Sequence, residues 1–153
     1  MTLITGATRR AFLATASGGL AALAFAPAAA LADAKMVADE IAKLYGDKPI
    51  KEGRIKLDLP SIAENGLVVP LTFEVESPMT EADYVKAIHI FADGNPNPHV
   101  AAFMFTPLAP KAAASIRIRL AKTQNIVAVA EMSNGDLYKA TKEVKVTIGG
   151  CGG

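Results

Sequence analysis

The chain has 153 residues, and its 16 basic and 15 acidic side chains leave a formal charge of +1 at pH 7. This nearly equal number of basic and acidic side chains gives no electrostatic basis for nucleic-acid binding, which requires concentrated positive charge. A single cysteine excludes an intramolecular disulfide, and the length suits one domain with one core.

The first segment has the parts of an export signal. Arg9 and Arg10 precede a weakly apolar, alanine-rich run that ends with a small-x-small sequence at Ala32. These features are typical of a secretory signal peptide, and the adjacent arginines favour the twin-arginine pathway. A membrane-spanning helix is the weaker alternative, because Pro27 interrupts the run and alanine contributes little to insertion. We expect residues 1–32 to be a twin-arginine signal peptide and the mature chain to be exported, without a membrane anchor.

The mature chain opens with a predicted helix over residues 33–45. Its apolar residues recur at spacings of three and four among charged ones, which indicates an amphipathic helix. Gly46, with Pro49 shortly after it, favours an end at this point. The apolar stripe consists of Met36, Val37, Ile41 and Leu44. We expect this stripe to pack on the domain or on a partner.

From Gly53 onward the hydrophobic period changes to two. Apolar residues alternate with polar ones in several short segments, which predicts strands with one solvated face. The segment 84–92 is apolar on both faces apart from Lys86 and His89, so it is either a central strand or a strand that a partner covers. The expected strands are residues 54–59, 71–76, 84–92, 100–105, 115–120, 126–130, 137–141 and 144–148.

Turn signals separate these segments at fairly regular intervals. Pro60 and Pro70 mark loops or strand ends, Asp93-Gly94-Asn95-Pro96-Asn97-Pro98 is dense in turn residues, and Asn134-Gly135 is a strong hairpin signal. Short strands with such turns, and no second convincing helix, are the pattern of an antiparallel β-sandwich of immunoglobulin-like architecture. We therefore expect one all-β domain over residues 33–148, with an N-terminal helix.

The last predicted strand leads directly into Gly149-Gly150-Cys151-Gly152-Gly153. Four glycines leave the backbone around the only cysteine almost unrestrained and free of bulky neighbours. At about 3.3 to 3.6 Å per extended residue, this segment spans roughly 17 Å. Its own residues cannot bury the thiol, and no basic residue in the segment favours the thiolate. We expect residues 149–153 to be a flexible arm that carries Cys151 as an attachment point, with no catalytic residue in the chain.

Two other functions are compatible with this sequence. The first is an exported β-sandwich that binds a soft metal such as copper, because the chain holds histidines, methionines and a cysteine. These residues are His89, His99, Met36, Met79, Met104, Met132 and Cys151, and no two of them show a recognised ligand spacing. The second is a structural or adhesion module with an inert tail. A self-contained enzyme is disfavoured, because a flexible arm cannot hold the thiol against a histidine.

The terminal sequence Val146-Thr147-Ile148-Gly149-Gly150-Cys151-Gly152-Gly153 resembles that of the SoxY family, the sulfur-carrier subunits of the thiosulfate-oxidising Sox system. Its glycine-cysteine-glycine motif is highly specific in this context. The resemblance extends to the twin-arginine start and to four internal segments, which together cover most of the mature domain. These segments are Phe91 to Pro96, Phe103 to Pro107, Ile116 to Leu120 and Ala128 to Ser133.

The resemblance implies a periplasmic carrier that works as a heterodimer with SoxZ, itself a β-sandwich. Cys151 matches the carrier cysteine, to which the haem-containing partner SoxAX couples thiosulfate oxidatively, giving a cysteine S-thiosulfonate. SoxB, a metal-dependent hydrolase, then releases sulfate and leaves a persulfide, and in some systems a sulfane dehydrogenase oxidises the remaining sulfur. The implied cargo is covalently bound sulfur, and no separate cofactor is expected.

Overall fold

The computed structural model describes residues 28–149. Arg9 and Arg10 of the predicted signal, and residues 150–153 of the predicted arm, lie outside this range. Within it, one helix precedes nine strands. The elements are α1 (Ala28–Tyr45), β1 (Ile50–Glu52), β2 (Ile55–Asp58), β3 (Ile62–Asn65), β4 (Val69–Val75), β5 (Val85–Ala92), β6 (His99–Met104), β7 (Ala112–Ile118), β8 (Gln124–Met132) and β9 (Leu137–Ile148).

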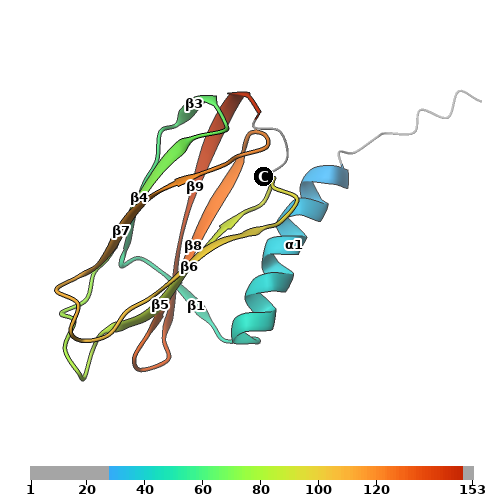
Figure 1. Ribbon diagram of the computed structural model, residues 1–153. Helices are drawn as coiled ribbons and strands as arrows, with labels where there is room; N and C mark the ends of the chain where they lie inside the picture. Colours follow the sequence, from blue (N-terminus) through green and yellow to red (C-terminus); the bar gives the residue numbers. More distant parts are fainter. Residues whose placement is uncertain (1–27, 150–153) are drawn as a thin grey trace, which may run out of the picture.

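The strands form two sheets that face each other, and α1 adds a third layer (Figure 1). The larger sheet has the strand order β1-β9-β8-β5-β6, with β3 also paired to β9, and the smaller sheet has the order β2-β4-β7. α1 lies against the face of the larger sheet that points away from the smaller one. The predicted β-sandwich with an N-terminal helix is confirmed, and its architecture is immunoglobulin-like.

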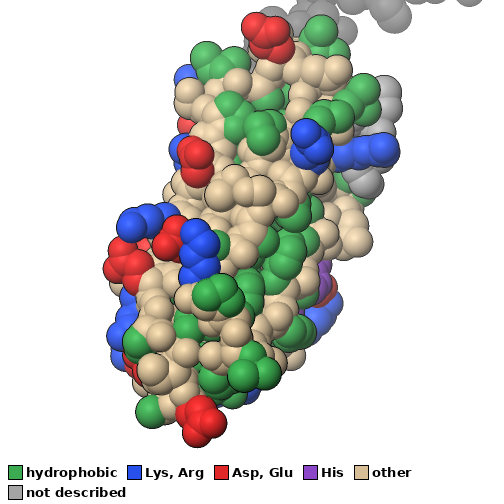
Figure 2. Space-filling model, turned by 60° about the vertical axis from the view of Figure 1, so that its left-hand side comes forward, with side chains coloured by type: hydrophobic (Ala, Val, Ile, Leu, Met, Phe, Trp, Pro, Cys, Tyr) green, Lys and Arg blue, Asp and Glu red, His purple; other side chains and the backbone are tan. Residues whose placement is uncertain are grey.

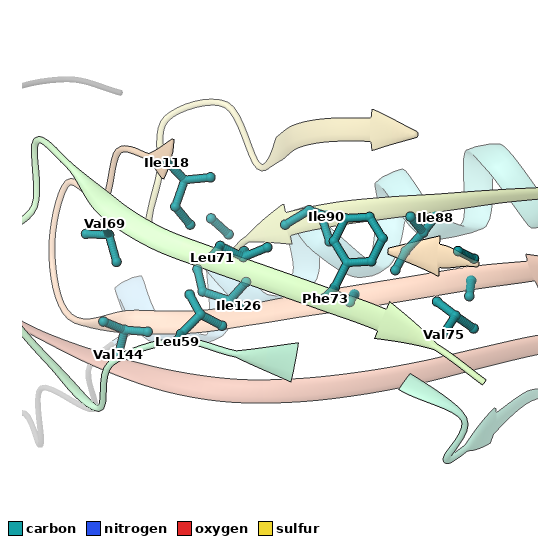
Figure 3. Close-up of a cluster of buried hydrophobic side chains, with 14 of the residues drawn as sticks. Leu59, Val69, Leu71, Phe73, Val75, Ile88, Ile90, Ile118, Ile126 and Val144 are labelled. Carbon is teal, nitrogen blue, oxygen red and sulfur yellow. The ribbon is translucent and has the colours of Figure 1, made fainter. Parts of the chain in front are cut away.

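The main core lies between the two sheets. In β4, Leu71, Phe73 and Val75 are buried, while the alternate residues Thr72 and Glu74 are exposed. Successive side chains of a strand point to opposite faces, so the apolar half of β4 meets the larger sheet. Figure 3 shows these side chains beside apolar residues of β5 and β8 within one cluster.

β5 is buried on both faces because it has a layer on each side. Ile88 and Ile90 belong to the core between the sheets, whereas Phe91 packs with Val37 and Tyr45 of α1. β5 also pairs with β8 along one edge and with β6 along the other. Of the two interpretations that the sequence left open for this segment, the central strand is correct, and α1 supplies the cover.

α1 uses only part of its predicted apolar stripe for packing. Val37, Ile41 and Tyr45 belong to the second core cluster, against the larger sheet. Met36 and Leu44 remain 42% and 45% exposed. The helix is therefore held by one narrow line of contacts.

α1 begins at Ala28, earlier than the predicted start at residue 33. The predicted cleavage site after Ala32 therefore falls within the helix. Cleavage there would leave residues 33–45, which include the three α1 residues of the second core cluster. No helix in the described part of the chain, α1 included, has the length and apolar character needed to span a membrane. The end of the signal peptide stays a prediction.

β9 corrects two features of the predicted strand set. The segments 137–141 and 144–148 form one strand of 12 residues, because the pairing with β8 continues through Lys142 and Glu143. The outer edge of β9 pairs in parallel with β1 near its start and with β3 near its end. Antiparallel pairs predominate, but the larger sheet is mixed, and the hydrophobic pattern did not reveal β1 or β3.

The surface carries both charged and apolar groups. Figure 2 shows hydrophobic side chains that run as a band down one face of the molecule, beside a group of charged side chains. Among the exposed apolar residues are Met104 at the end of β6 and Leu108 in the loop that follows, 72% and 93% exposed. β6 is also an edge of the larger sheet. Edge strands and exposed apolar groups are typical features of association surfaces.

Candidate functional site

The sequence places the candidate site at the end of β9, where the predicted arm begins. Gly149 is the last described residue, and Gly150, Cys151, Gly152 and Gly153 lie outside the described part of the chain. The structure therefore shows how the base of the predicted arm is held. We call residues 145–149 the arm root.

β3 and the turn after it hold one edge of the arm root (Figure 1). The N–H of Lys145 donates to the carbonyl of Ser61 at 3.0 Å, and the N–H of Gly66 donates to the carbonyl of Ile148 at 2.8 Å. The carbonyl of Gly66 in turn accepts from the N–H of Leu120 at 2.8 Å. Gly66 thus connects the arm root to the loop between β7 and β8.

That loop, residues 119–123, holds the other edge, and we call it the anchor loop. The N–H of Val146 donates to Oγ1 of Thr123 at 2.9 Å. Gly149 approaches Ala121 so closely that a Cβ at position 149 would overlap the carbonyl oxygen of Ala121. Glycine is therefore required at this position by a close backbone approach. At least one glycine of the predicted arm belongs to its fixed base.

Asn95 determines the shape of the anchor loop. Its Nδ2 donates to the carbonyl of Arg119 at 2.8 Å, and its Oδ1 accepts from the N–H of Ala121 at 3.0 Å. Gln124, only 4% exposed, donates from Nε2 to the same Oδ1 and to the carbonyl of Lys122, each at 3.0 Å. Because buried amide groups need hydrogen-bond partners, this set of bonds fixes the anchor loop, which is not part of a β-sheet hydrogen-bond ladder.

The turn after β5 brings Asn95 into this position. The N–H of Gly94 donates to Oε1 of Gln124 at 2.7 Å, and a Cβ on Gly94 would lie only 2.8 Å from Cβ of Gln124. Asp93 accepts from the backbone N–H and the side-chain Nδ2 of Asn125 at 2.8 and 2.9 Å. The sequence predicted this segment only as a turn. In the structure it also ties the β5–β6 hairpin to the anchor loop.

These contacts limit where the thiol of Cys151 can be. Cys151 is two residues beyond Gly149, so the two Cα atoms lie within about 7 Å of each other at about 3.6 Å per extended residue. The span of roughly 17 Å applies to the whole five-residue segment. The sulfur therefore stays close to the end of the sandwich that holds the arm root.

A histidine pair lies on β5 and β6. Nδ1 of His89 and Nε2 of His99 are 3.0 Å apart, the ring of Tyr45 meets His89 edge-on, and Phe91 stacks on His99. The Tyr45 hydroxyl is buried without a hydrogen-bond partner among the described residues. Burial and the nearby Glu131 raise the pKa of Tyr45 to about 12. Burial lowers the pKa of His89, and His99 lowers that pKa further, so His89 is neutral at pH 7.

The histidine pair predicts a loss of stability in mildly acidic solution. An unfolded chain takes up a proton on histidine near pH 6.5, whereas burial and His99 hold the pKa of His89 lower in the folded protein. Below about pH 6.5 the unfolded state then binds more protons, so the free energy of unfolding should fall as the pH drops from about 7.5 to about 5.5. Urea unfolding at the two pH values measures this change.

His89→Phe supplies the control, because phenylalanine keeps a ring beside Tyr45 and cannot titrate. The groups that act on His89 are His99 and Glu131, and the carboxylate of Glu131 opposes the shift as its smallest cause. The free energy of unfolding of the variant should change less between the two pH values. Equal changes in the two proteins would show that the pH dependence has another origin.

The other metal-ligand candidates lie apart from one another. Met79 and Met132 are in the main core, 7% and 1% exposed, whereas Met36 and Met104 are at the surface. Within residues 28–149, no group of three or more His, Cys, Asp or Glu side chains is arranged to hold a metal ion. Among the described residues, the histidine pair is therefore the one place where two of the candidate soft-metal ligands lie close together.

Comparison with known proteins finds relatives of the whole domain. Residues 41–151 match the family described as "Sulfur oxidation protein SoxY", and this match includes the arm root and Cys151. The solved structure of the sulfur carrier protein SoxY from Chlorobium limicola f thiosulfatophilum is 41% identical, with a TM-score of 0.64 over 75% of this chain and 99% of that chain. No curated protein sequence matches the chain.

Superoxide reductases share the fold at lower identity. A superoxide reductase (neelaredoxin) from Ignicoccus hospitalis is 21% identical, with a TM-score of 0.55 over 69% of this chain and 85% of that chain. The enzyme from Nanoarchaeum equitans is 17% identical, with a TM-score of 0.51 over 62% of this chain and 99% of that chain. At these identities the likeness shows a common sandwich fold and carries nothing about activity.

Proposed function

The chain belongs to the SoxY family of sulfur oxidation proteins, and on that basis we propose that it holds sulfur covalently on Cys151 and presents it to the enzymes of the Sox cycle. The observation that carries the proposal is the extent of the family match, which covers all the described strands, the arm root and Cys151. The 41% identical relative is itself a sulfur carrier. A carrier needs a reactive atom that other proteins can reach and a fixed base for the segment that bears it, and the arm root supplies that base.

Loading of the carrier is an oxidation that requires a redox partner. The thiol of Cys151 and the outer sulfur of thiosulfate form an S–S bond, and this step releases one proton and two electrons. We propose that a haem protein like SoxAX accepts the electrons, as the family resemblance implies. The product is a cysteine S-thiosulfonate on the arm.

Release of sulfate is a hydrolysis. The oxygen of water forms a bond to the sulfone sulfur, the S–S bond to that sulfone breaks, and a persulfide stays on Cys151. A metal-dependent hydrolase like SoxB would perform this step, and a sulfane dehydrogenase, where one exists, would oxidise the remaining sulfur before a second hydrolysis. The carrier contributes the sulfur atom and its position, and the partner enzymes contribute the catalysis.

The proposal includes a compartment and a partner subunit. The arginine pair and the alanine-rich run of residues 1–32 support export through the twin-arginine pathway to the periplasm. The exposed apolar groups near the edge strand β6 support association with a subunit like SoxZ. In an oxidising compartment an exposed lone thiol is also free to form a disulfide between molecules.

Mass spectrometry of the peptide that contains Cys151 tests the proposal. Protein isolated from cells grown on thiosulfate should carry sulfur-containing mass additions on this peptide, and treatment with a reducing thiol should remove them. Protein from cells grown without thiosulfate is the control. An unmodified peptide under both conditions would favour the inert module, and equilibrium dialysis with Cu(I) would then test the soft-metal alternative.

A further inference from the structure

A hollow of about 170 Å³ lies between the turn after β5 and the anchor loop. It is lined by Asn95, Asn97, His99, Val100 and Arg119, and we call it the polar hollow. A water molecule takes up about 30 Å³ of liquid, and pockets for drug-sized ligands measure roughly 300 to 1,000 Å³. The polar hollow is therefore of a size for a small ion.

The charge around the polar hollow favours an anion. Arg119 contributes a guanidinium, and no acidic side chain is among the lining residues. Within residues 28–149 the guanidinium of Arg119 has no ion pair, in contrast to Lys86, which pairs with Glu131 at 2.8 Å. A guanidinium presents its N–H groups in a planar fork that matches the oxygens of oxyanions. The group is thus available to a ligand.

Asn95 and His99 add positioned polar groups. Nδ2 of Asn95 donates to the carbonyl of Arg119 at 2.8 Å, which fixes the backbone of Arg119 at the rim. His99 directs Nε2 toward Nδ1 of His89 at 3.0 Å. When Nδ1 of His89 donates this bond, the hydrogen of the His99 ring is on its own Nδ1, which can then donate to a ligand in the polar hollow. His89 is buried, so His99 is the member of the pair that lines the polar hollow.

We propose that the polar hollow binds a sulfur oxyanion, through the guanidinium of Arg119, the ring of His99 and the amide of Asn95. The choice of a sulfur oxyanion rests on the proposed function, in which thiosulfate is the substrate. Free thiosulfate and the thiosulfonate on Cys151 both end in a sulfur atom with three oxygens. The same three oxygens would meet the same groups whether the ion is free or bound to the arm.

The arm root lies close to the polar hollow. Thiosulfate bound in the hollow and a thiosulfonate on Cys151 would therefore occupy the same region. Asn95 lines the hollow, and its Oδ1 accepts from the N–H of Ala121 at 3.0 Å, while Gly149 abuts the carbonyl of the same residue. The Cα of Cys151 lies within about 7 Å of the Cα of Gly149. A sulfonate on the cysteine extends further by the side chain and two sulfur atoms. Thiosulfate in the hollow would lie near the thiol that it joins, and a loaded arm could place its sulfonate there.

NMR titration of the histidine rings tests the proposal, because His89 and His99 are the only histidines in the chain. The mature Cys151→Ser protein is titrated with sodium thiosulfate, and sodium chloride at equal ionic strength is the reference. Thiosulfate should shift the His99 ring signals in a saturable way, because a bound anion accepts a hydrogen bond from the ring and changes its surroundings. This binding does not need Cys151, so it separates the polar hollow from the carrier proposal.

Arg119→Gln should weaken thiosulfate binding by about tenfold or more, the effect of losing one charge-assisted hydrogen bond or ion pair. Arg117→Gln is the matched control, because it removes the same charge from the same segment but lines a different hollow, with Pro70 and Thr72. It should bind nearly as tightly as the parent. Arg119→Lys keeps the positive charge but loses the planar guanidinium, so its affinity for thiosulfate should lie between those of Arg119→Gln and Arg117→Gln. Shifts that are equal in chloride and thiosulfate, or equal losses in both glutamine variants, would overturn the proposal.

A loaded carrier distinguishes the two sources of the ion. Tetrathionate converts the thiol of Cys151 to the thiosulfonate, with thiosulfate and a proton as the other products. If the arm delivers the sulfonate, the His99 signals of the loaded protein should match those of the thiosulfate-saturated serine variant before any thiosulfate is added. If free thiosulfate is the ligand, the loaded protein should still titrate. Absence of a specific shift in both proteins would refute binding from either source.

Discussion

Replacing Cys151 with serine is expected to abolish thiosulfate-dependent sulfate release and to leave the fold intact. Serine cannot form the S–S bond that joins thiosulfate to the carrier, and no other cysteine exists in the chain. The core is built by residues that precede Gly149, so the free energy of unfolding should change by no more than about 0.5 kcal/mol, as for most surface substitutions. Sulfate release by reconstituted partner enzymes, together with thermal unfolding, measures both outcomes.

A relocated thiol provides the control for this loss. Thr147→Cys in the serine background places an exposed thiol on β9, only four residues away, but on a strand that is held along both edges. This double variant should react with alkylating reagents and still fail to support sulfate release. Full turnover by the single serine variant would remove Cys151 from the carrier role, whereas rescue by the double variant would show that the free segment is unnecessary.

Gly149→Ala is expected to detach the arm root from the anchor loop. The new Cβ would overlap the carbonyl oxygen of Ala121, so either the end of β9 or the anchor loop must move. Overpacking of this kind costs about 1 to 3 kcal/mol, which lowers the melting temperature by about 3 to 15 °C for a domain of this size. A nitroxide attached to Cys151 should also rotate more freely, and loading of the carrier should slow.

Gly135→Ala is the matched variant for stability. Gly135 lies in the turn between β8 and β9, with φ at 86°, and a Cβ there meets nothing within 4 Å. Alanine at this φ should destabilise the protein through backbone strain of about 1 kcal/mol or more, at the opposite end of β9. Its nitroxide spectrum should match that of the parent. Identical spectra for both alanine variants would mean that the contact at Ala121 does not restrain the arm.

The fold could be predicted where one short segment carries the signal by itself. Alternation along β4 predicted which of its residues face the core, and the apolar run of β5 limited that strand to a central position or a partner-covered one. β1 and β3 have three and four residues, and they exist because β9 offers a free edge far along the chain. Pro70 was expected at a loop or strand end, yet it lies inside β4. It is tolerated there because β2 pairs only with the part of β4 that begins at Thr72.

The candidate site likewise has one part that a short sequence pattern reveals and another that depends on contacts between distant residues. Cys151 and its glycines form a local pattern, and the sequence was sufficient to single them out. The contacts of Asn95 and Gln124 join residues 29 positions apart, and a buried glutamine has no periodic signal that distinguishes it from a surface residue. The sequence did not reveal that His89 and His99 form a pair, because the β5–β6 register is what brings the two ring nitrogens to 3.0 Å. The dense turn sequence was the one available hint.

The close fit of Gly149 against Ala121 has a consequence for how the proposed partner enzymes would reach the sulfur atom. With that point fixed, the sulfur atom stays inside a sphere of roughly 10 Å radius, two extended residues plus one side chain. A globular enzyme whose active centre enters that sphere fills the approach to it. In the carrier role that we propose, two enzymes could therefore not serve one molecule simultaneously, and each would have to leave before the next arrives. In the proposed cycle the order of the reactions would then be decided by which enzyme recognises the current state of the sulfur.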